Sequence, residues 1–116
     1  MEIKMQINWK DELSVAITVC DTNGTILEMN KKSAESFSRE GGYELIGKNL
    51  YDCHTQASVS RINELIIENK TNIYTIEKNG IKKIIYQSPW YENGKLKGLV
   101  ELTFEIPPAM PHFIRS

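Results

Sequence analysis

The sequence predicts an α+β fold in which two strands come first, short helices follow, and three strands close the chain. Three Asn-Gly dipeptides, at 23–24, 79–80 and 93–94, each lie between runs that alternate apolar and polar residues. A type I′ turn needs positive φ at both central residues, so Asn-Gly between alternating runs is the strongest short-range hairpin signal. The stretch up to about Lys70 lacks strand periodicity, which places the helices between the first hairpin and a three-stranded meander.

The first hairpin comprises strands over Val15–Asp21 and Thr25–Met29. Asn30 can then cap a helix over 31–38 by accepting a hydrogen bond from a free backbone N–H. The pair Gly41-Gly42 ends that helix, and a single turn over Tyr43–Ile46 stops at Gly47.

A longer helix is predicted from about Thr55 to Asn69. Its apolar residues recur at helical spacing and form one stripe, namely Val59, Ile62, Leu65 and Ile66. The meander then runs over 71–106. Residues 1–14 precede this domain as an arm or cap, and residues 107–116 follow it as a tail that contains proline.

Composition narrows the class of partner. The chain has 116 residues, enough for one domain with its own core, and a formal charge of −1. This balance argues against a nucleic-acid surface and gives no electrostatic reason to bind an anionic membrane. With two cysteines, no CxxC spacing, no signal peptide and no long apolar run, we expect a cytoplasmic protein with reduced thiols.

Turn register predicts which meander residues share a face, because residues that flank a two-residue loop pair directly. In this register Tyr74 pairs with Ile85, and Gln87 pairs with Val100. The face turned toward the helices would carry Tyr74, Ile76, Ile85, Gln87, Val100, Leu102 and Phe104. The other face would carry Ile73, Thr75, Ile84, Tyr86, Ser88, Trp90, Leu99, Glu101 and Thr103.

The second of these faces has an apolar centre and polar edges, as a buried surface has, whether the N-terminal arm or a second subunit covers it. We therefore predict a homodimer. Its interface would include Ile84, Tyr86, Trp90 and Leu99, with Trp9 of the N-terminal arm nearby.

Several segments resemble the PAS domain family. AITVCDTNGTILEMNKKSAESF, from residue 16, resembles the opening of a PAS domain, where an Asp-x-x-Gly hairpin leads to an Asn that begins the first helix. LIGKNLYDCH resembles the Gly-x-x-Leu segment before the long PAS helix, and GKLKGLVELTFEI resembles the last strands. The similarity covers roughly 15–106. The segments DCH, YTIEKNGIKKIIYQSPWYENG and IPPAMPHFIR further resemble small stand-alone bacterial PAS sensor proteins.

The resemblance implies a PAS-like (profilin-like) fold: a five-stranded antiparallel sheet with short helices and one longer helix packed on one face, often around a ligand cavity. It argues against two cofactors. Flavin-binding PAS domains carry Asn-Cys-Arg-Phe-Leu-Gln, and the cysteine in the second position forms the flavin adduct. This chain has Asn-Leu-Tyr-Asp-Cys-His at 49–54, with leucine and not cysteine in that position. The haem ligand of oxygen-sensing PAS domains would fall near Arg61, and no histidine lies between His54 and His112.

A small-molecule pocket is predicted between the long helix and the inward sheet face. Gln87 is its best single candidate, because a polar side chain in an apolar row needs either a backbone partner or a bound ligand. The predicted lining residues are Cys53, His54, Ile62, Ile66, Tyr74, Ile85, Gln87, Val100 and Leu102. Cys53 and His54 can each ligate iron or zinc, but two adjacent ligands do not complete a tetrahedral site.

No catalytic arrangement stands out, so the sequence predicts a sensor or binding module and not an enzyme. A ligand or a signalling protein partner would shift the packing between helix and sheet, and the opposite face would transmit the change through a dimer in trans. Two alternatives remain at this stage. One is a ligand-free dimerisation or scaffolding domain, and the other is a haem or metal protein that uses Cys53 and His54.

Overall fold

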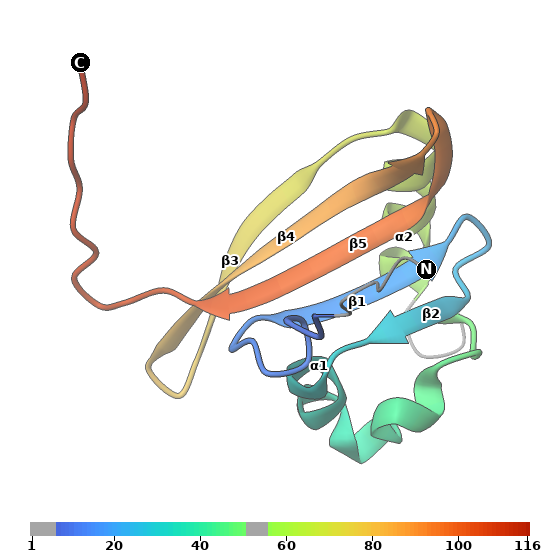
Figure 1. Ribbon diagram of the computed structural model, residues 1–116, viewed down its shortest axis with the longest axis horizontal. Coiled ribbons are helices and arrows are strands. Elements are labelled where there is room, and N and C mark those ends of the chain that lie inside the picture. The colour runs from blue at the N-terminus through green and yellow to red at the C-terminus, as the bar shows by residue number, and fades with distance from the viewer. Residues whose placement is uncertain (1–6, 51–55) are drawn as a thin grey trace, which may run out of the picture.

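The structure is a computed structural model that describes residues 7–50 and 56–116. It contains one five-stranded antiparallel sheet with strand order β2-β1-β5-β4-β3. In Figure 1 the longer helix lies behind the sheet, and the shorter helices lie below it. The predicted α+β architecture, a five-stranded antiparallel sheet with few helices, is confirmed. The strands are β1 (Ala16–Asp21), β2 (Ile26–Met29), β3 (Asn72–Lys78), β4 (Ile81–Glu92) and β5 (Lys95–Glu105).

The three Asn-Gly pairs all connect neighbouring antiparallel strands, as predicted, but with two kinds of turn. Asn79, Gly80, Asn93 and Gly94 all have positive φ, which is the signature of type I′ turns. In the first hairpin only Gly24 has positive φ. There the Asp21 carboxylate organises the turn by accepting hydrogen bonds from Asn23 N at 2.9 Å and Thr25 N at 3.0 Å.

Asn30 begins helix α1 (Lys31–Ser36), as predicted, and also joins three parts of the fold. Its Oδ1 accepts hydrogen bonds from Ser33 N at 3.0 Å and from Ile17 N on β1 at 2.9 Å. Its Nδ2 donates to the carbonyl oxygens of Lys10 and Val15 at 2.8 Å and 2.7 Å. A side chain that is 3% exposed therefore ties α1, β1 and the arm together.

Two short 3₁₀ helices follow, η1 (Ser38–Glu40) and η2 (Gly42–Leu45). The chain then returns along the free edge of β2, where Gly47 N donates to the Ile26 carbonyl at 2.7 Å and Ile26 N to the Lys48 carbonyl at 2.9 Å. These bonds cover backbone groups that an edge strand would otherwise expose. Ile26, Met29 and Leu45 form a buried cluster beneath this segment.

The longer helix, α2, spans Gln56–Glu68 and packs its apolar stripe on the sheet. Leu65 is fully buried, and Ile62 and Ile66 are nearly so. They form the main core cluster with Cys20 of β1 and Leu99 of β5. None of the helices in the described part of the chain is long and apolar enough to span a bilayer.

The predicted register between β4 and β5 is wrong by one residue. Glu92 pairs with Lys95 and Tyr91 with Leu96, as the turn requires, but Trp90 pairs with Gly98, which leaves Lys97 as an extra residue on β5. Beyond this bulge Gln87 pairs with Glu101 and Ile85 with Thr103. Because side chains alternate between faces, the shift exchanges the two faces of β5.

The bulge lies at a point where β5 approaches β1 too closely for a side chain. A Cβ atom on Gly98, which has φ +153°, would lie 1.9 Å from the Cys20 carbonyl oxygen. An isolated glycine in a strand is a sign of such a bulge or close approach. Gly98 was therefore the sequence signal for the shifted register.

The helices leave three parts of the chain uncovered: β3, residues 107–116 and the described part of the N-terminal arm. Nearly all of β3 is exposed, including Tyr74 and Ile76, each 42% exposed. Residues 107–116 leave the end of β5 and run away from the sheet (Figure 1), with Phe113 and Ile114 exposed. In the arm, residues 9–12 form a turn whose Lys10 pairs with Glu28 on β2.

Candidate functional site: a cavity behind the sheet

A cavity of about 130 Å³ lies between the helix-covered face of the sheet and the segment that carries η1, η2 and α2. We call that face the inner face and the opposite one the outer face. Four strands and the helical region contribute side chains to the cavity. Its described lining residues are Thr18, Cys20, Ile26, Met29, Phe37, Glu40, Leu45, Leu50, Ile62, Gln87, Leu99 and Glu101.

The walls of the cavity are mostly apolar and belong to the two core clusters. Ile26, Met29 and Leu45 supply one wall, and Cys20, Ile62 and Leu99 supply another. Leu50 packs against both clusters. A mostly apolar hollow with a few inward polar groups is the usual form of a small-molecule site.

Apart from Glu40 of η1, the polar residues of the lining come from the strands. Glu101 Oε2 accepts a hydrogen bond from Gln87 Nε2 at 2.8 Å, and Gln87 Oε1 accepts one from Asn72 Nδ2 at 3.0 Å. Asn72 Oδ1 in turn accepts a hydrogen bond from the guanidinium Nη2 of Arg61, on α2, at 3.3 Å. Gln87 is 8% exposed, and its amide is held at both ends by side chains of the sheet.

Two side chains on the inner face, those of Cys20 and Tyr74, have raised pKa values. Burial raises the pKa of the Cys20 thiol from 9.0 to about 11, with smaller contributions from Asp21 and Glu101, while a hydrogen bond with the Leu99 backbone lowers it. Burial also raises the pKa of Tyr74, and the negative charge of Glu101 raises it further. Cys20 is therefore a neutral thiol at physiological pH, which makes it a poor nucleophile.

Cys20 contacts both the cavity and a residue of the outer face. Its side chain lines the cavity, while its backbone carbonyl accepts a hydrogen bond from the indole Nε1 of Trp90 at 3.0 Å. Trp90 pairs with Gly98, whose missing side chain lets β5 lie close against β1 at this point. One residue of β1 thus contacts both sides of the sheet.

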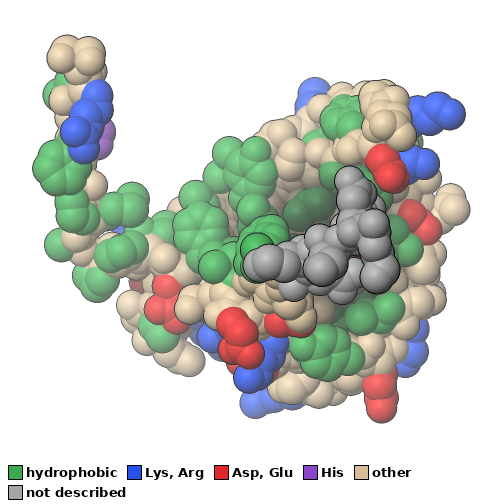
Figure 2. All heavy atoms as spheres, viewed as in Figure 1, with side chains coloured by type: hydrophobic (Ala, Val, Ile, Leu, Met, Phe, Trp, Pro, Cys, Tyr) green, Lys and Arg blue, Asp and Glu red, His purple; other side chains and the backbone are tan. Residues whose placement is uncertain are grey.

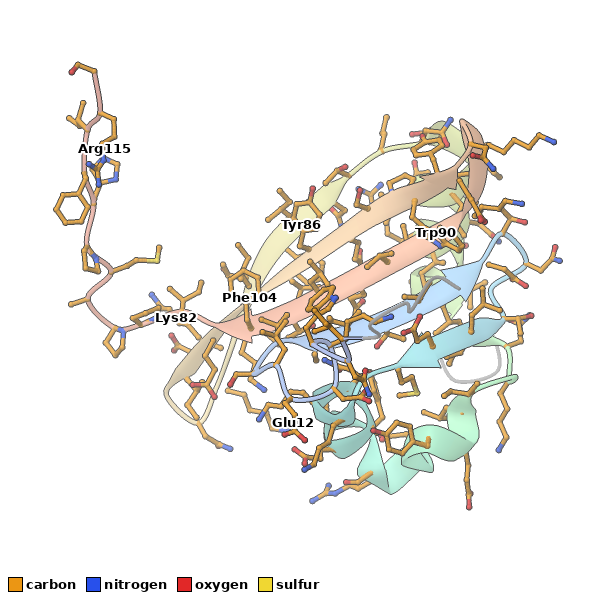
Figure 3. The ribbon with its side chains drawn as sticks, viewed as in Figure 1. Glu12, Lys82, Tyr86, Trp90, Phe104 and Arg115 are labelled. Atoms are coloured by element: carbon orange, nitrogen blue, oxygen red, sulfur yellow. The ribbon has the colours of Figure 1, made fainter. Side chains whose placement is uncertain are left out.

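The outer face carries an apolar surface along β4 and β5. Figure 2 shows hydrophobic side chains gathered on this side of the sheet, and Figure 3 labels Tyr86, Trp90 and Phe104 there. By register, and with partial exposure, the surface consists of Ile84, Tyr86, Trp90, Val100, Leu102 and Phe104. We call this set the outer patch.

The sequence profile of the family described as PAS fold matches residues 11–75, which is more than half of the chain. The chain belongs to this PAS family. No curated protein sequence is significantly similar to it.

Solved structures share its fold at low sequence identity. The PAS domain of the histidine kinase ThkA superimposes with a TM-score of 0.65 at 19% identity, covering 79% of this chain and 99% of that one. The Aer2 receptor from Vibrio cholerae, described as a dual PAS-heme oxygen sensor, gives 0.62 at 17%, with 80% and 95% covered. A C-terminal domain from Streptococcus mutans gives 0.70 at 17%, with 86% and 81% covered.

Within this PAS fold only some of the predicted pocket residues line the cavity. Ile62 and Gln87 line the cavity. Ile66 and Ile85 are buried but are not among its lining residues, and Tyr74 lies half-exposed on β3. Cys53 and His54 lie outside the described residues.

The remaining two predicted pocket residues, Val100 and Leu102, were placed on the wrong face. The β5 bulge turns both of them to the outer face. The same shift corrects the predicted interface, because Leu99 is 4% exposed within the main core cluster and lines the cavity. Ile84, Tyr86 and Trp90 do lie on the outer face. Trp9 is 60% exposed in the turn of the arm.

Sequence reasoning missed most of the PAS cavity's actual lining. Glu101 was assigned to the outer face. Gly98, which marks the β5 bulge, was the only sequence feature that indicated the inner face for Glu101. The residues from β1, β2 and η2 gave no signal, since apolar side chains that border a cavity have the same pattern as those of a solid core. The described residues contain no group of three or more His, Cys, Asp or Glu that could hold a metal ion.

Proposed function

We propose that this protein is a sensory PAS module that binds a small molecule in the cavity and signals in trans through the outer patch. The observation that carries the proposal is the inward pair Gln87 and Glu101 in an otherwise mostly apolar space of about 130 Å³. Buried polar groups of this kind give a ligand orientation and specificity. Sensor proteins among the structural neighbours, including a histidine kinase and a receptor, support a sensory role.

A ligand in the cavity would contact residues on which the sheet depends. Cys20 borders the cavity and also accepts the hydrogen bond of Trp90, and Leu99 borders it one residue before Val100 of the outer patch. A shift of β1 against β5 would therefore move the Trp90 indole. This coupling supports a change that begins in the cavity and ends at the opposite face.

The outer patch is our proposed homodimer surface. Fully burying a large apolar side chain stabilises by about 1.5–3 kcal/mol, so several of them would offset much of the cost of association. The exposed groups of this face, Ile73 and Phe104 among them, make it suited to a second copy or to a signalling protein.

A ligand-free dimerisation domain is the second candidate, and two observations favour it. The cavity is smaller than the roughly 300–1,000 Å³ of most ligand pockets. The Gln87 amide is already bonded through both of its polar atoms, though to side chains and not to backbone.

Haem is a property of the Aer2 receptor among the structural neighbours, and for this chain it remains the less favoured alternative. A space of about 130 Å³ is close to the roughly 150 Å³ of a cavity that holds benzene, so a porphyrin would require a large expansion of the core. Cys53 and His54, the ligands suggested for that alternative, lie outside the described residues.

Native mass spectrometry of freshly purified protein tests the proposal, because it reports retained ligand and oligomeric state together. Ile62→Phe fills the cavity from α2 and should abolish ligand retention. Ile84→Phe makes the same change on the outer face and is the matched control, which should retain the ligand. A wild-type protein that is dimeric and carries no ligand, and that binds none from a metabolite mixture, would support the ligand-free alternative instead.

A further inference from the structure

The charge of the cavity lining indicates which class of small molecule it would hold. Two of the described lining residues, Glu40 and Glu101, are acidic, and none is Lys, Arg or His. Arg61, at the end of the polar chain, is held outside the lining by Glu64 at 2.9 Å and Asn72 at 3.3 Å. An anionic ligand would therefore meet a carboxylate without a compensating cation in the described lining.

Glu101 has hydrogen-bonding capacity left for a ligand. It lies at the centre of the inner face, between its cross-strand partners Thr18 and Gln87. A carboxylate offers about four lone-pair positions, and the Gln87 amide occupies one of them, at Oε2. The hydroxyl of Thr18, the other neighbour, is hydrogen-bonded to Ser33 Oγ at 2.6 Å.

The orientation of Gln87 reinforces the preference for a donor. Its Oε1 accepts the hydrogen bond of Asn72 and its Nε2 donates to Glu101, so turning the amide over would break both contacts. The acceptor that remains in this pair is the carboxylate. The charge of Glu101 is also felt nearby, since it adds to the raised pKa of Tyr74.

The rest of the lining suits a small apolar body. Ile26, Met29 and Leu45 provide aliphatic contacts, and Phe37 provides an aromatic ring. Aromatic faces attract ammonium groups within about 6 Å of the ring. The volume of about 130 Å³ matches a benzene-sized molecule.

We propose that the cavity binds a compact organic cation, an ammonium group on an apolar body, with Glu101 as its counter-ion. This inference rests on the proposed ligand-binding function and names the ligand class of the same site. The ammonium would donate to the Glu101 carboxylate, and its apolar body would lie among the residues of β2 and η2.

Three probes that share one benzyl-sized body test the charge preference: benzylammonium, benzyl alcohol and benzoate. Their affinities are measured by NMR titration of the isotope-labelled full chain at neutral pH and low salt. We expect benzylammonium to bind at least about tenfold more tightly than benzyl alcohol, and benzoate to bind most weakly.

Glu101→Gln keeps an acceptor for Gln87 but removes the charge, so it should reduce the affinity for benzylammonium to that for benzyl alcohol. Glu77→Gln removes the same charge at an exposed position of β3 and should leave all three affinities unchanged. If Glu101→Gln fails to fold, the comparison of the three probes on the wild-type protein still decides the question.

Two results would overturn the inference in different ways. Equal binding of the three probes, or tighter binding of benzoate, would remove the charge preference and leave the ligand-binding function standing. No binding of any probe at millimolar concentration would overturn both the charge preference and the binding function.

Discussion

Replacing Leu99 by alanine, and separately replacing Leu102 by alanine, tests the register that assigns the two faces of β5. Both are leucines on one strand, three residues apart, so they lie on opposite faces, and the bulge decides which of them faces the core. Leu99 is 4% exposed and packs with Cys20, Ile62, Leu65 and Ile66, whereas Leu102 is partly exposed on the outer face.

The expected magnitudes follow from these surroundings. Truncating a buried leucine to alanine costs about 2–5 kcal/mol, made up of a transfer contribution and a cavity contribution. Because Leu99 sits between a tight core cluster and an existing cavity, we expect a loss of about 3 kcal/mol in the free energy of unfolding. Leu102 is open to solvent on one side and should lose only about 1 kcal/mol.

Urea unfolding followed by far-UV circular dichroism measures both losses. The measurement is made at two protein concentrations, because a dimer that buries Leu102 would make the cost of Leu102→Ala depend on concentration. If Leu102→Ala were the more destabilising change at low concentration, β5 would have the register without a bulge, and the lining of the cavity would have to be reassigned.

Three further predictions concern single residues. Gly98→Ala should abolish native circular dichroism, since the new Cβ would lie 1.9 Å from the Cys20 carbonyl oxygen. Gly80→Ala, whose Cβ would meet no other part of the protein within 4 Å, is the control and should still fold. A folded Gly98→Ala protein would contradict the close approach of β1 and β5. In the folded Cys53→Ser variant, Cys20 should react with a thiol reagent at least about 100-fold more slowly than in the same variant unfolded in urea. The reason is that a pKa raised from 9.0 to about 11 lowers the thiolate fraction by that factor. A similar rate in the folded and unfolded protein would refute the burial of Cys20. Leu102→Asp should convert a wild-type dimer to monomers in sedimentation equilibrium, and a wild type that is monomeric at high micromolar concentration would reject the outer patch as a dimer surface.

Local chemistry made much of the fold predictable from the sequence. The Asn-Gly pairs specify turns because few other residues accept positive φ, and Asn30 specifies a helix start because its side chain can replace a missing acceptor. The stripe of Ile62, Leu65 and Ile66 identifies the buried side of α2 from spacing alone. In each case the information lies within a few residues of sequence.

The candidate site was less predictable because it depends on contacts between distant segments. A single extra residue, Lys97, reverses the faces of Leu99, Val100, Glu101 and Leu102. The extent of helical cover also escaped prediction, so Tyr74 and Ile76 share the inner face but remain 42% exposed. The position of the cavity next to β2 depends on the path of 41–50, which has no periodic pattern.

The coupling between the cavity and the outer patch is the central claim, and the indole signal of Trp90 tests it most directly. In a Trp9→Phe variant, Trp90 is the only tryptophan, and its Nε1–H is the group that bonds to the Cys20 carbonyl. The variant is titrated with whichever benzyl probe binds most tightly, and ¹H–¹⁵N NMR follows the indole together with the amides of Gln87 and Leu99. We predict that all three signals move with one dissociation constant. An indole signal that stays fixed while the two cavity amides shift to saturation would contradict the coupling.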